Sequence, residues 1–189
     1  LNIKLLFAVN EAKAVNMPKE NIERAIKRGS GESGGAAFEE ITYEGYGPKG
    51  TALLIETLTD NRNRTAPEMR SIFDSNGGKM GGANSVAYLF ERKGIIRIPA
   101  NNITEDDLWE AALEAGAENL ETSEEAFEIT SAPAELNAVR KVLEKKFTIE
   151  TAEFRMIPKN PNPIDAKTGQ KLMNLMDALE ENDDVQKVY

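Results

Sequence analysis

The sequence has 189 residues, of which 40% are hydrophobic, and a formal net charge of −9. It contains neither cysteine nor histidine, which excludes disulfide bonds, thiolate metal sites, cysteine nucleophiles and the usual general base of enzymes. No apolar run approaches the about 20 residues that a membrane-spanning helix needs, and the apolar start lacks a signal-peptide cleavage pattern. We therefore expect a cytoplasmic protein with no membrane partner and no cofactor.

Taken in chain order, the first region reads as helical. Apolar residues recur at helical spacing over residues 2–14 and again over residues 18–28, and Gly29 ends the second segment. Pro18 suits the first turn of the second helix. Residues 30–35 are rich in glycine and serine and predict a flexible linker. We assign residues 1–35 to an N-terminal helical domain.

The second region alternates strand and helix signals. Residues 41–46 and 51–58 predict two strands joined by a Gly-Pro-Lys-Gly turn. A helix is expected over residues 66–75 with Thr65 as its N-cap, and a further strand over residues 85–90.

The third region predicts the order β-α-β-α-β. Strands are expected at residues 95–98, 126–130 and 148–157, and helices at residues 105–115 and 134–146. Thr104 followed by Asp107 resembles a capping box at the start of the first of these helices.

A last helix over residues 165–180 and a short strand over residues 185–189 make a poor domain alone. They would complete the second region, so we predict that the third region is inserted into the second. The domains would then be residues 36–93 with 160–189, and residues 94–159. The fold class is α+β, with helices packed on mostly antiparallel sheets.

Four sequence blocks carry a family resemblance. They are Met17–Gly29, Tyr43–Gly50, Thr59–Thr65 and Leu179–Tyr189. In this order the blocks resemble the YebC family, whose members are described as probable transcriptional regulators or as translational activators that work with the ribosome. The resemblance implies a three-domain α+β layout. It also implies a basic segment, with a Gly-His-Ser-Lys-Trp-like run, ahead of the first block, and the sequence starts at Leu1 without it.

Two loops of the second region combine positive charge with small polar residues. Arg62 and Arg64 stand at a strand-to-helix junction, where a helix N-terminus favours anions. The alternative is a capped helix whose arginines pair with Asp60 and Glu68. Lys79 lies in the run Gly77–Gly82, which lacks the Walker pattern of a nucleotide-hydrolysing site. That run could approach a phosphate closely or be only a mobile turn.

The N-terminal helices also carry basic residues, and these could track a phosphate backbone. The alternative is a solvated helix face, because glutamates nearly balance the charge. The complete set of candidate nucleic-acid-binding residues is Lys13, Lys19, Arg24, Lys27, Arg28, Arg62, Arg64 and Lys79.

Acidic residues and tyrosines complete the candidates. Residues 1–97 hold 14 Lys+Arg and 12 Asp+Glu, whereas residues 98–189 hold 9 and 20. This asymmetry either orients a bound polyanion or only keeps the protein soluble. Asp183 and Asp184 lack the spacing of a calcium loop, so no metal is expected. Tyr43 and Tyr46 could stack on bases, although one of them is more typical of a strand core.

We predict a non-enzymatic nucleic-acid-binding regulator. As the resemblance implies, the first hypothesis is a DNA-binding transcriptional regulator. The alternative is a ribosome-associated translational activator that contacts RNA. The sequence does not fix the oligomeric state.

Overall fold

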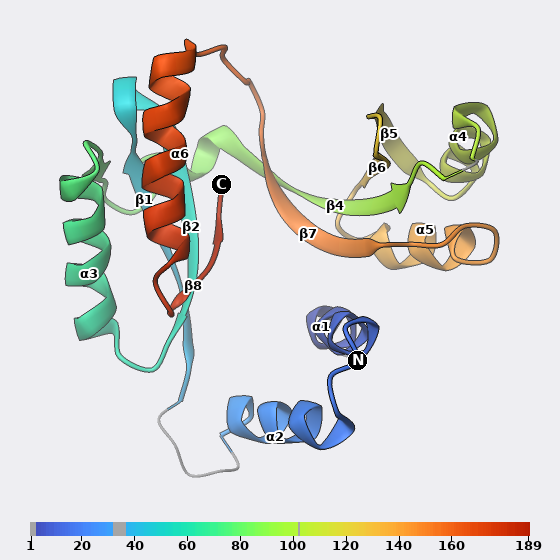
Figure 1. Ribbon diagram of the computed structural model, residues 1–189, viewed down its shortest axis with the longest axis horizontal. Coiled ribbons are helices and arrows are strands. Elements are labelled where there is room, and N and C mark those ends of the chain that lie inside the picture. The colour runs from blue at the N-terminus through green and yellow to red at the C-terminus, as the bar shows by residue number, and fades with distance from the viewer. Residues whose placement is uncertain (1–2, 32–36, 102) are drawn as a thin grey trace. The chain divides into compact units, whose positions relative to one another are not determined.

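The computed structural model describes residues 3–31, 37–101 and 103–189. Contacts divide the chain into two compact units (Figure 1). Unit 1 comprises Leu1–Ile22 and Arg92–Ile157, and unit 2 comprises Glu23–Glu91 and Pro158–Tyr189. Residues 32–35 of the expected linker lie outside the described residues.

Unit 2 is built on a four-stranded antiparallel sheet with the order β3-β1-β2-β8. Its strands are β1 (Glu39–Tyr46), β2 (Ala52–Thr59), β3 (Lys79–Met80) and β8 (Val185–Val188). A 3₁₀ turn at Pro48–Gly50 joins β1 to β2. This mostly antiparallel arrangement confirms the expected α+β class.

Two helices, α3 (Arg62–Ser75) and α6 (Ala166–Glu180), pack on one face of this sheet. Figure 1 shows them side by side on the same side of β1 and β2. The alternation of side chains along a strand sends every second residue of β1 and β2 toward the helices. The buried core that results contains Tyr43, Leu53, Ile55, Met69, Phe73, Leu175, Leu179 and Val188.

The C-terminal strand pairs with the sheet of the second region, which confirms that expected pairing. In the register of β2 and β8, Ile55 lies opposite Val188. Leu54 and Tyr189 exchange backbone hydrogen bonds of 2.9 and 2.8 Å. The chain leaves unit 2 within β4 and returns to it at Pro158, the last residue of β7.

Unit 1 contains the second four-stranded sheet, with the order β5-β6-β4-β7. Its elements in chain order are β4 (Phe90–Pro99), α4 (Glu105–Glu114), β5 (Ala117–Thr122), β6 (Ala126–Ser131), α5 (Leu136–Leu143) and β7 (Thr151–Pro158). The expected β-α-β-α-β order was therefore one strand short. The observed β-α-β-β-α-β order is that of a split βαβ fold.

The N-terminal helix α1 (Ile3–Ala14) contributes to the core of unit 1. Phe7 is only 6% exposed. Its ring centroid lies 6.2 Å from that of Phe154 on β7, and the Arg140 guanidinium carbon lies 5.9 Å from the Phe7 centroid. The second helix, α2 (Lys19–Gly29), follows a turn in which Asn16 has a φ of 58°.

Two local expectations were wrong. Residues 85–89 do not form a strand, because β4 begins only at Phe90 after a 3₁₀ turn at Ala87–Leu89. The N-cap of α3 is Asn61 and not Thr65. The helix therefore begins four residues earlier than expected and includes Thr65.

Candidate nucleic-acid interface

The junction between β2 and α3 is closed by its own residues. The Asn61 side chain accepts a hydrogen bond of 3.2 Å from the backbone N–H of Arg64. Thr65 is fully buried in the first turns, and its hydroxyl donates to the carboxylate of Asp184 at 2.7 Å. Part of the expected anion site at this helix start is thus occupied by side chains of the protein.

Arg64 is held by an internal ion pair. Its Nη2 lies 2.8 Å from both carboxylate oxygens of Asp184 and 3.4 Å from Asp60. Burial would raise the pKa of Asp184, but hydrogen bonds from Arg64 and Thr65 hold that pKa below its ordinary value. Arg64 therefore ties the C-terminal segment to α3, and only about half of its side chain remains exposed.

Arg62 differs from Arg64 although the two stand two residues apart. Within the described part of the chain, the Arg62 side chain forms no ion pair or hydrogen bond, and the residue is exposed. A free guanidinium can bind two phosphate oxygens at once. Of the two arginines, Arg62 is thus the one available to a ligand.

A second free arginine on α3 was missed by the sequence analysis. Arg70 is exposed and, among the residues that the structure describes, has no ion pair, even though Asp74 lies one turn further on. Arg62 and Arg70 are separated by about 12 Å along the helix axis. The helical period that places Met69 and Phe73 in the core also places Arg70 outside it, and this signal could have identified it.

The glycine-rich turn is packed tightly at Gly78. Gly77 has a φ of +73° and follows the C-terminus of α3, where the Gly78 N–H donates to the Phe73 carbonyl at 2.9 Å. A Cβ atom at Gly78 would lie 2.9 Å from side-chain atoms of Phe73 and Leu175. Packing inside the protein thus requires glycine at position 78, and the positive φ favours glycine at position 77.

The backbone N–H groups after this turn already bind an anion, the carboxylate of Glu44. It accepts hydrogen bonds of 2.6, 2.7 and 2.8 Å from Asn84, Val86 and Ala87. Burial would raise the pKa of Glu44, but these backbone donors hold it below its ordinary value. Such a concavity suits phosphate, yet here it is filled by a residue of β1 that sequence reasoning did not single out.

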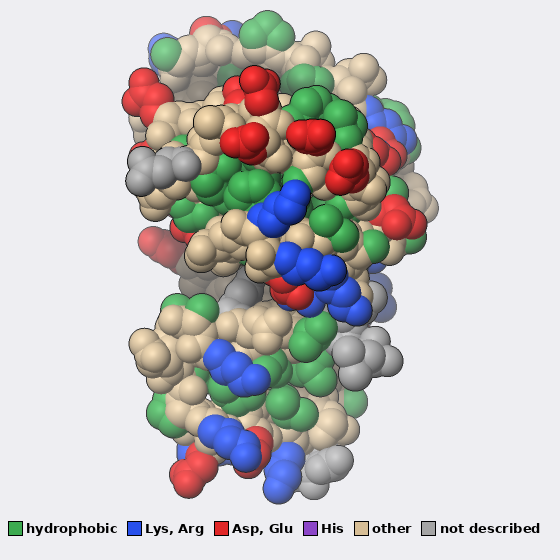
Figure 2. Space-filling model, turned by 90° about the vertical axis from the view of Figure 1, so that its right-hand side faces the viewer, with side chains coloured by type: hydrophobic (Ala, Val, Ile, Leu, Met, Phe, Trp, Pro, Cys, Tyr) green, Lys and Arg blue, Asp and Glu red, His purple; other side chains and the backbone are tan. Residues whose placement is uncertain are grey.

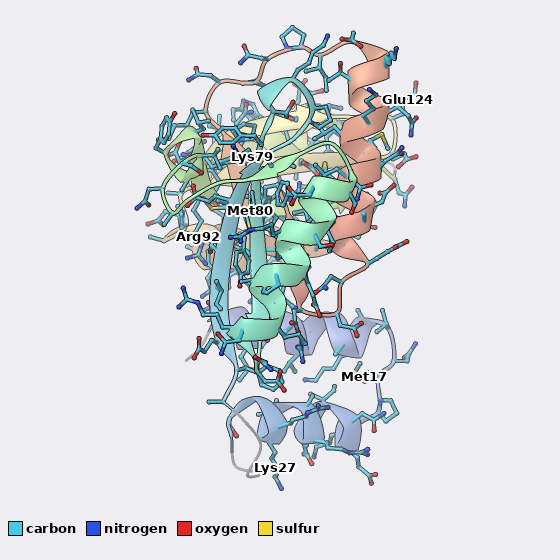
Figure 3. The ribbon with its side chains drawn as sticks, turned by 90° about the vertical axis from the view of Figure 1, so that its left-hand side faces the viewer. Met17, Lys27, Lys79, Met80, Arg92 and Glu124 are labelled. Carbon is cyan, nitrogen blue, oxygen red and sulfur yellow. The ribbon has the colours of Figure 1, made fainter. Side chains whose placement is uncertain are left out.

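Lys79 lies on the edge strand β3, directly opposite Tyr46 of β1. Opposed residues of an antiparallel pair share a face of the sheet. Its neighbour Met80 lies opposite Gly45 and packs against the core under α3, so Lys79 belongs to the other face (Figure 3). Lys79 is exposed and has no ion pair within the described ranges.

The candidate residues of the N-terminal helices are exposed: Lys13, Lys19, Arg24, Lys27 and Arg28. Lys13 and Lys19 belong to unit 1, whereas Arg24, Lys27 and Arg28 belong to unit 2. Figure 3 shows Lys27 on α2. Lys19 and Arg24 take part in interactions of their own. That these residues bind nucleic acid stays a prediction.

Charge is distributed unevenly within each unit, although the two units are similar in net charge. Unit 1 holds 11 Lys+Arg and 16 Asp+Glu, and unit 2 holds 12 and 16. Within unit 1 the excess of acid lies in residues 92–157, which hold 8 Lys+Arg and 14 Asp+Glu. Figure 2 shows a face on which Asp and Glu side chains gather in one area and Lys and Arg side chains in another. A bound polyanion would therefore be favoured by some faces and repelled by others.

The described residues hold no group of three His, Cys, Asp or Glu side chains that could bind a metal ion. Of the helices among them, none is both long and apolar enough to cross a bilayer.

Two family models match the sequence. Residues 1–32 match the TACO1/YebC protein N-terminal domain, and residues 38–189 match the TACO1/YebC second and third domain. The chain is 52% identical to a "probable transcriptional regulatory protein" of Persephonella marina, with all of this chain and 76% of the relative covered. It is 50% identical to a protein of the same description from Latilactobacillus sakei, with 100% and 78% covered.

The fold also has a solved counterpart. The crystal structure of a conserved hypothetical protein from Aquifex aeolicus superposes with a TM-score of 0.89 at 48% identity, covering 97% of this chain and 76% of that one. The family models and the solved structure each cover nearly all of this chain. The chain is a member of the TACO1/YebC family.

Proposed function

We propose that the chain is a non-enzymatic, cytoplasmic regulator of gene expression that binds nucleic acid, in the first place a DNA-binding transcriptional regulator. The proposal is supported by the descriptions of its relatives as probable transcriptional regulatory proteins. The observation that carries it is the exposed side of α3, where Arg62 and Arg70 present guanidinium groups that have no ion pair among the described residues. Guanidinium groups on a helix surface are typical contacts to phosphate oxygens.

The alternative is a ribosome-associated translational activator that contacts RNA. Phosphate contacts from Arg62 and Arg70 would serve either nucleic acid, because they position a partner without reading its sequence. Two exposed tyrosines of unit 2, Tyr46 and Tyr88, favour this alternative, since unpaired bases of RNA stack on aromatic side chains. The two functions therefore differ in the nucleic acid bound, which is duplex DNA in the first and RNA with unpaired bases in the second.

A salt titration tests the phosphate contacts. The affinity for duplex DNA is measured at several salt concentrations for the wild type and for the double variant Arg62→Ala, Arg70→Ala. Each lost phosphate contact should reduce the slope of log K against log salt by about 0.9, so we expect a reduction of about 1.8. Affinity should fall for all duplex sequences alike.

The matched control is Lys167→Ala with Lys171→Ala on α6, which removes the same charge from another exposed helix of unit 2. Equal slopes for the wild type and the arginine variant would refute the proposed surface. The proposed surface would also be refuted if the slope of log K against log salt fell as much for the α6 variant as for the α3 variant, because binding would then depend only on net charge.

A further inference from the structure

Unit 2 exposes two tyrosines on neighbouring segments. Tyr46 at the end of β1 is 37% exposed, and Tyr88 in the 3₁₀ turn before β4 is 66% exposed. Aromatic side chains usually bury most of their surface. We call the following set the Tyr88 surface: Tyr46, Lys79, Tyr88, Leu89 and Lys159.

The backbone under this surface is fixed by hydrogen bonds. The Tyr46 hydroxyl donates to the Ser85 carbonyl at 3.0 Å, and the Ala87 N–H donates to the Glu44 carboxylate at 2.8 Å. On the far side of the turn, the Lys159 N–H donates to the Leu89 carbonyl at 2.9 Å. Tyr88 is thus exposed although the turn that carries it is tied to β1 and to the segment after β7.

The charge beside the tyrosines is positive. Lys79 lies opposite Tyr46 in the register of β1 and β3, on the same face of the sheet. The Lys159 ammonium lies 2.9 Å from the Tyr88 carbonyl oxygen. The acidic residue beneath the turn, Glu44, is buried, and its carboxylate is occupied by hydrogen bonds from three backbone N–H groups. Two ammonium groups therefore flank two exposed aromatic rings.

We propose that the Tyr88 surface binds an unpaired stretch of polynucleotide, with bases stacked on Tyr88 and Tyr46 and phosphates held by Lys79 and Lys159. This inference rests on the proposed function and names the form of its ligand. Stacked aromatic rings with flanking cations are the means by which proteins hold single strands. A duplex offers no free base face to Tyr88, so the surface discriminates single strands from duplexes.

Fluorescence anisotropy with labelled oligodeoxythymidylate, oligouridylate and a duplex DNA of similar length tests the proposal. Loss of one base–aromatic stack should weaken binding of single strands by about 5- to 150-fold. We expect this loss for Tyr88→Ala, with duplex affinity unchanged. The two single-stranded probes show whether DNA or RNA is preferred.

Two controls separate stacking from other effects. Tyr88→Phe keeps the ring and should bind as the wild type does. Met173→Ala removes a 58% exposed apolar side chain from α6 and should also leave binding unchanged. Because stacking involves no counterion release, Tyr88→Ala should keep the wild-type salt slope on single strands, whereas Lys79→Ala should reduce it by about 0.7.

Three results would overturn the inference. The Tyr88→Ala variant could bind single strands as tightly as the wild type does. Alternatively, this variant could lose single-strand and duplex binding equally. Thirdly, the wild type could bind duplex DNA only, in which case the proposed function survives and the Tyr88 surface does not bind nucleic acid. Binding of none of the three probes would refute the proposed function together with the inference.

Discussion

Asp184 is the single residue on which the C-terminal segment of unit 2 depends most. It is 8% exposed and accepts hydrogen bonds from Arg64 and Thr65. Hydrogen bonds to a charged group contribute about 1.5–3 kcal/mol each. We expect Asp184→Asn to lower the free energy of unfolding at pH 7 by roughly that amount, measured by urea denaturation. The exposed neighbour provides the control, because Asp183→Asn should change stability by less than about 0.5 kcal/mol.

The cost of Asp184→Asn should depend on pH. The pKa of Asp184 is lower in the folded than in the unfolded chain, so its contribution is complete above the unfolded value of about 3.9. As the pH falls through the folded pKa, that contribution is lost. The stability difference between the wild type and Asp184→Asn should therefore shrink below about pH 4. A difference that stays constant down to pH 2 would show that the carboxylate charge plays no part.

Arg62 and Arg64 illustrate what the sequence could and could not predict about the site. The run that contains both was expected to be a basic loop between strand and helix. The junction lies where it was expected, because that depends on local composition, but α3 begins at Arg62, so both arginines belong to the helix. Their different roles depend on Asp184, which is 120 residues away from Arg64 in the chain. Local patterns give no access to such a contact, so the sequence left both arginines equivalent.

At the scale of elements, the turn from α3 to β3 tests the packing role of glycine. A Cβ atom at Gly78 would lie 2.9 Å from the backbone oxygen of Tyr46, which cannot move without disturbing β1. Overpacking of this kind costs about 1–3 kcal/mol, so Gly78→Ala should lower the thermal unfolding midpoint of unit 2. Gly82→Ala is the control, because a Cβ atom there would meet nothing within 4 Å.

If both glycine variants unfolded at the wild-type temperature, the turn would be loosely packed in solution. The earlier interpretation of residues 77–82 as a mobile turn would then be the better one. Calorimetry of the two variants beside the wild type decides between these outcomes.

Elements with local signals were predicted well. The Thr104 side chain caps α4 by accepting a hydrogen bond from the Asp107 N–H, as the sequence pattern indicated. The N-cap of α3 was misplaced because both Asn61 and Thr65 are good capping residues. Tertiary structure decides which of the two residues caps α3, since Thr65 is buried against Thr59 and Asp184.

The missed strands lacked such signals. β5, Ala117–Thr122, has few apolar residues, and its polar side chains are tolerated because it lies at the edge of its sheet. β3 has only two residues, Lys79 and Met80, which is too short for any periodicity. The apolar run around Val86 suggested a strand, but the Val86 N–H donates to the Glu44 carboxylate, and a 3₁₀ turn follows at Ala87–Leu89.

For the whole molecule, the insertion of residues 94–159 between residues 36–93 and 160–189 stays a proposal about folding units. Two observations support it. Every residue of the buried core around Phe73 and Leu175 comes from outside residues 92–157. The two chain ends that an excision would join are adjacent, because the Lys159 N–H donates to the Leu89 carbonyl.

We therefore predict that unit 2 folds when residues 91–157 are replaced by a short glycine–serine linker between Phe90 and Pro158. A shorter connection lowers the entropic cost of closing the chain. The excision leaves α6 and β8 in the chain, so α6 can still pack on the sheet and β8 can still pair with β2. Urea denaturation should show one cooperative transition, and hydrogen exchange should protect the amides of Leu54 and Tyr189, which bond to each other across β2 and β8.

The matched control is the same excised chain without residues 185–189, which leaves β2 as an exposed edge and removes Val188 from the core. This chain should lose the cooperative transition. If the excised chain with an intact C-terminus were also unfolded, the inserted segment would be required for the fold of unit 2. The chain would then fold as one cooperative body.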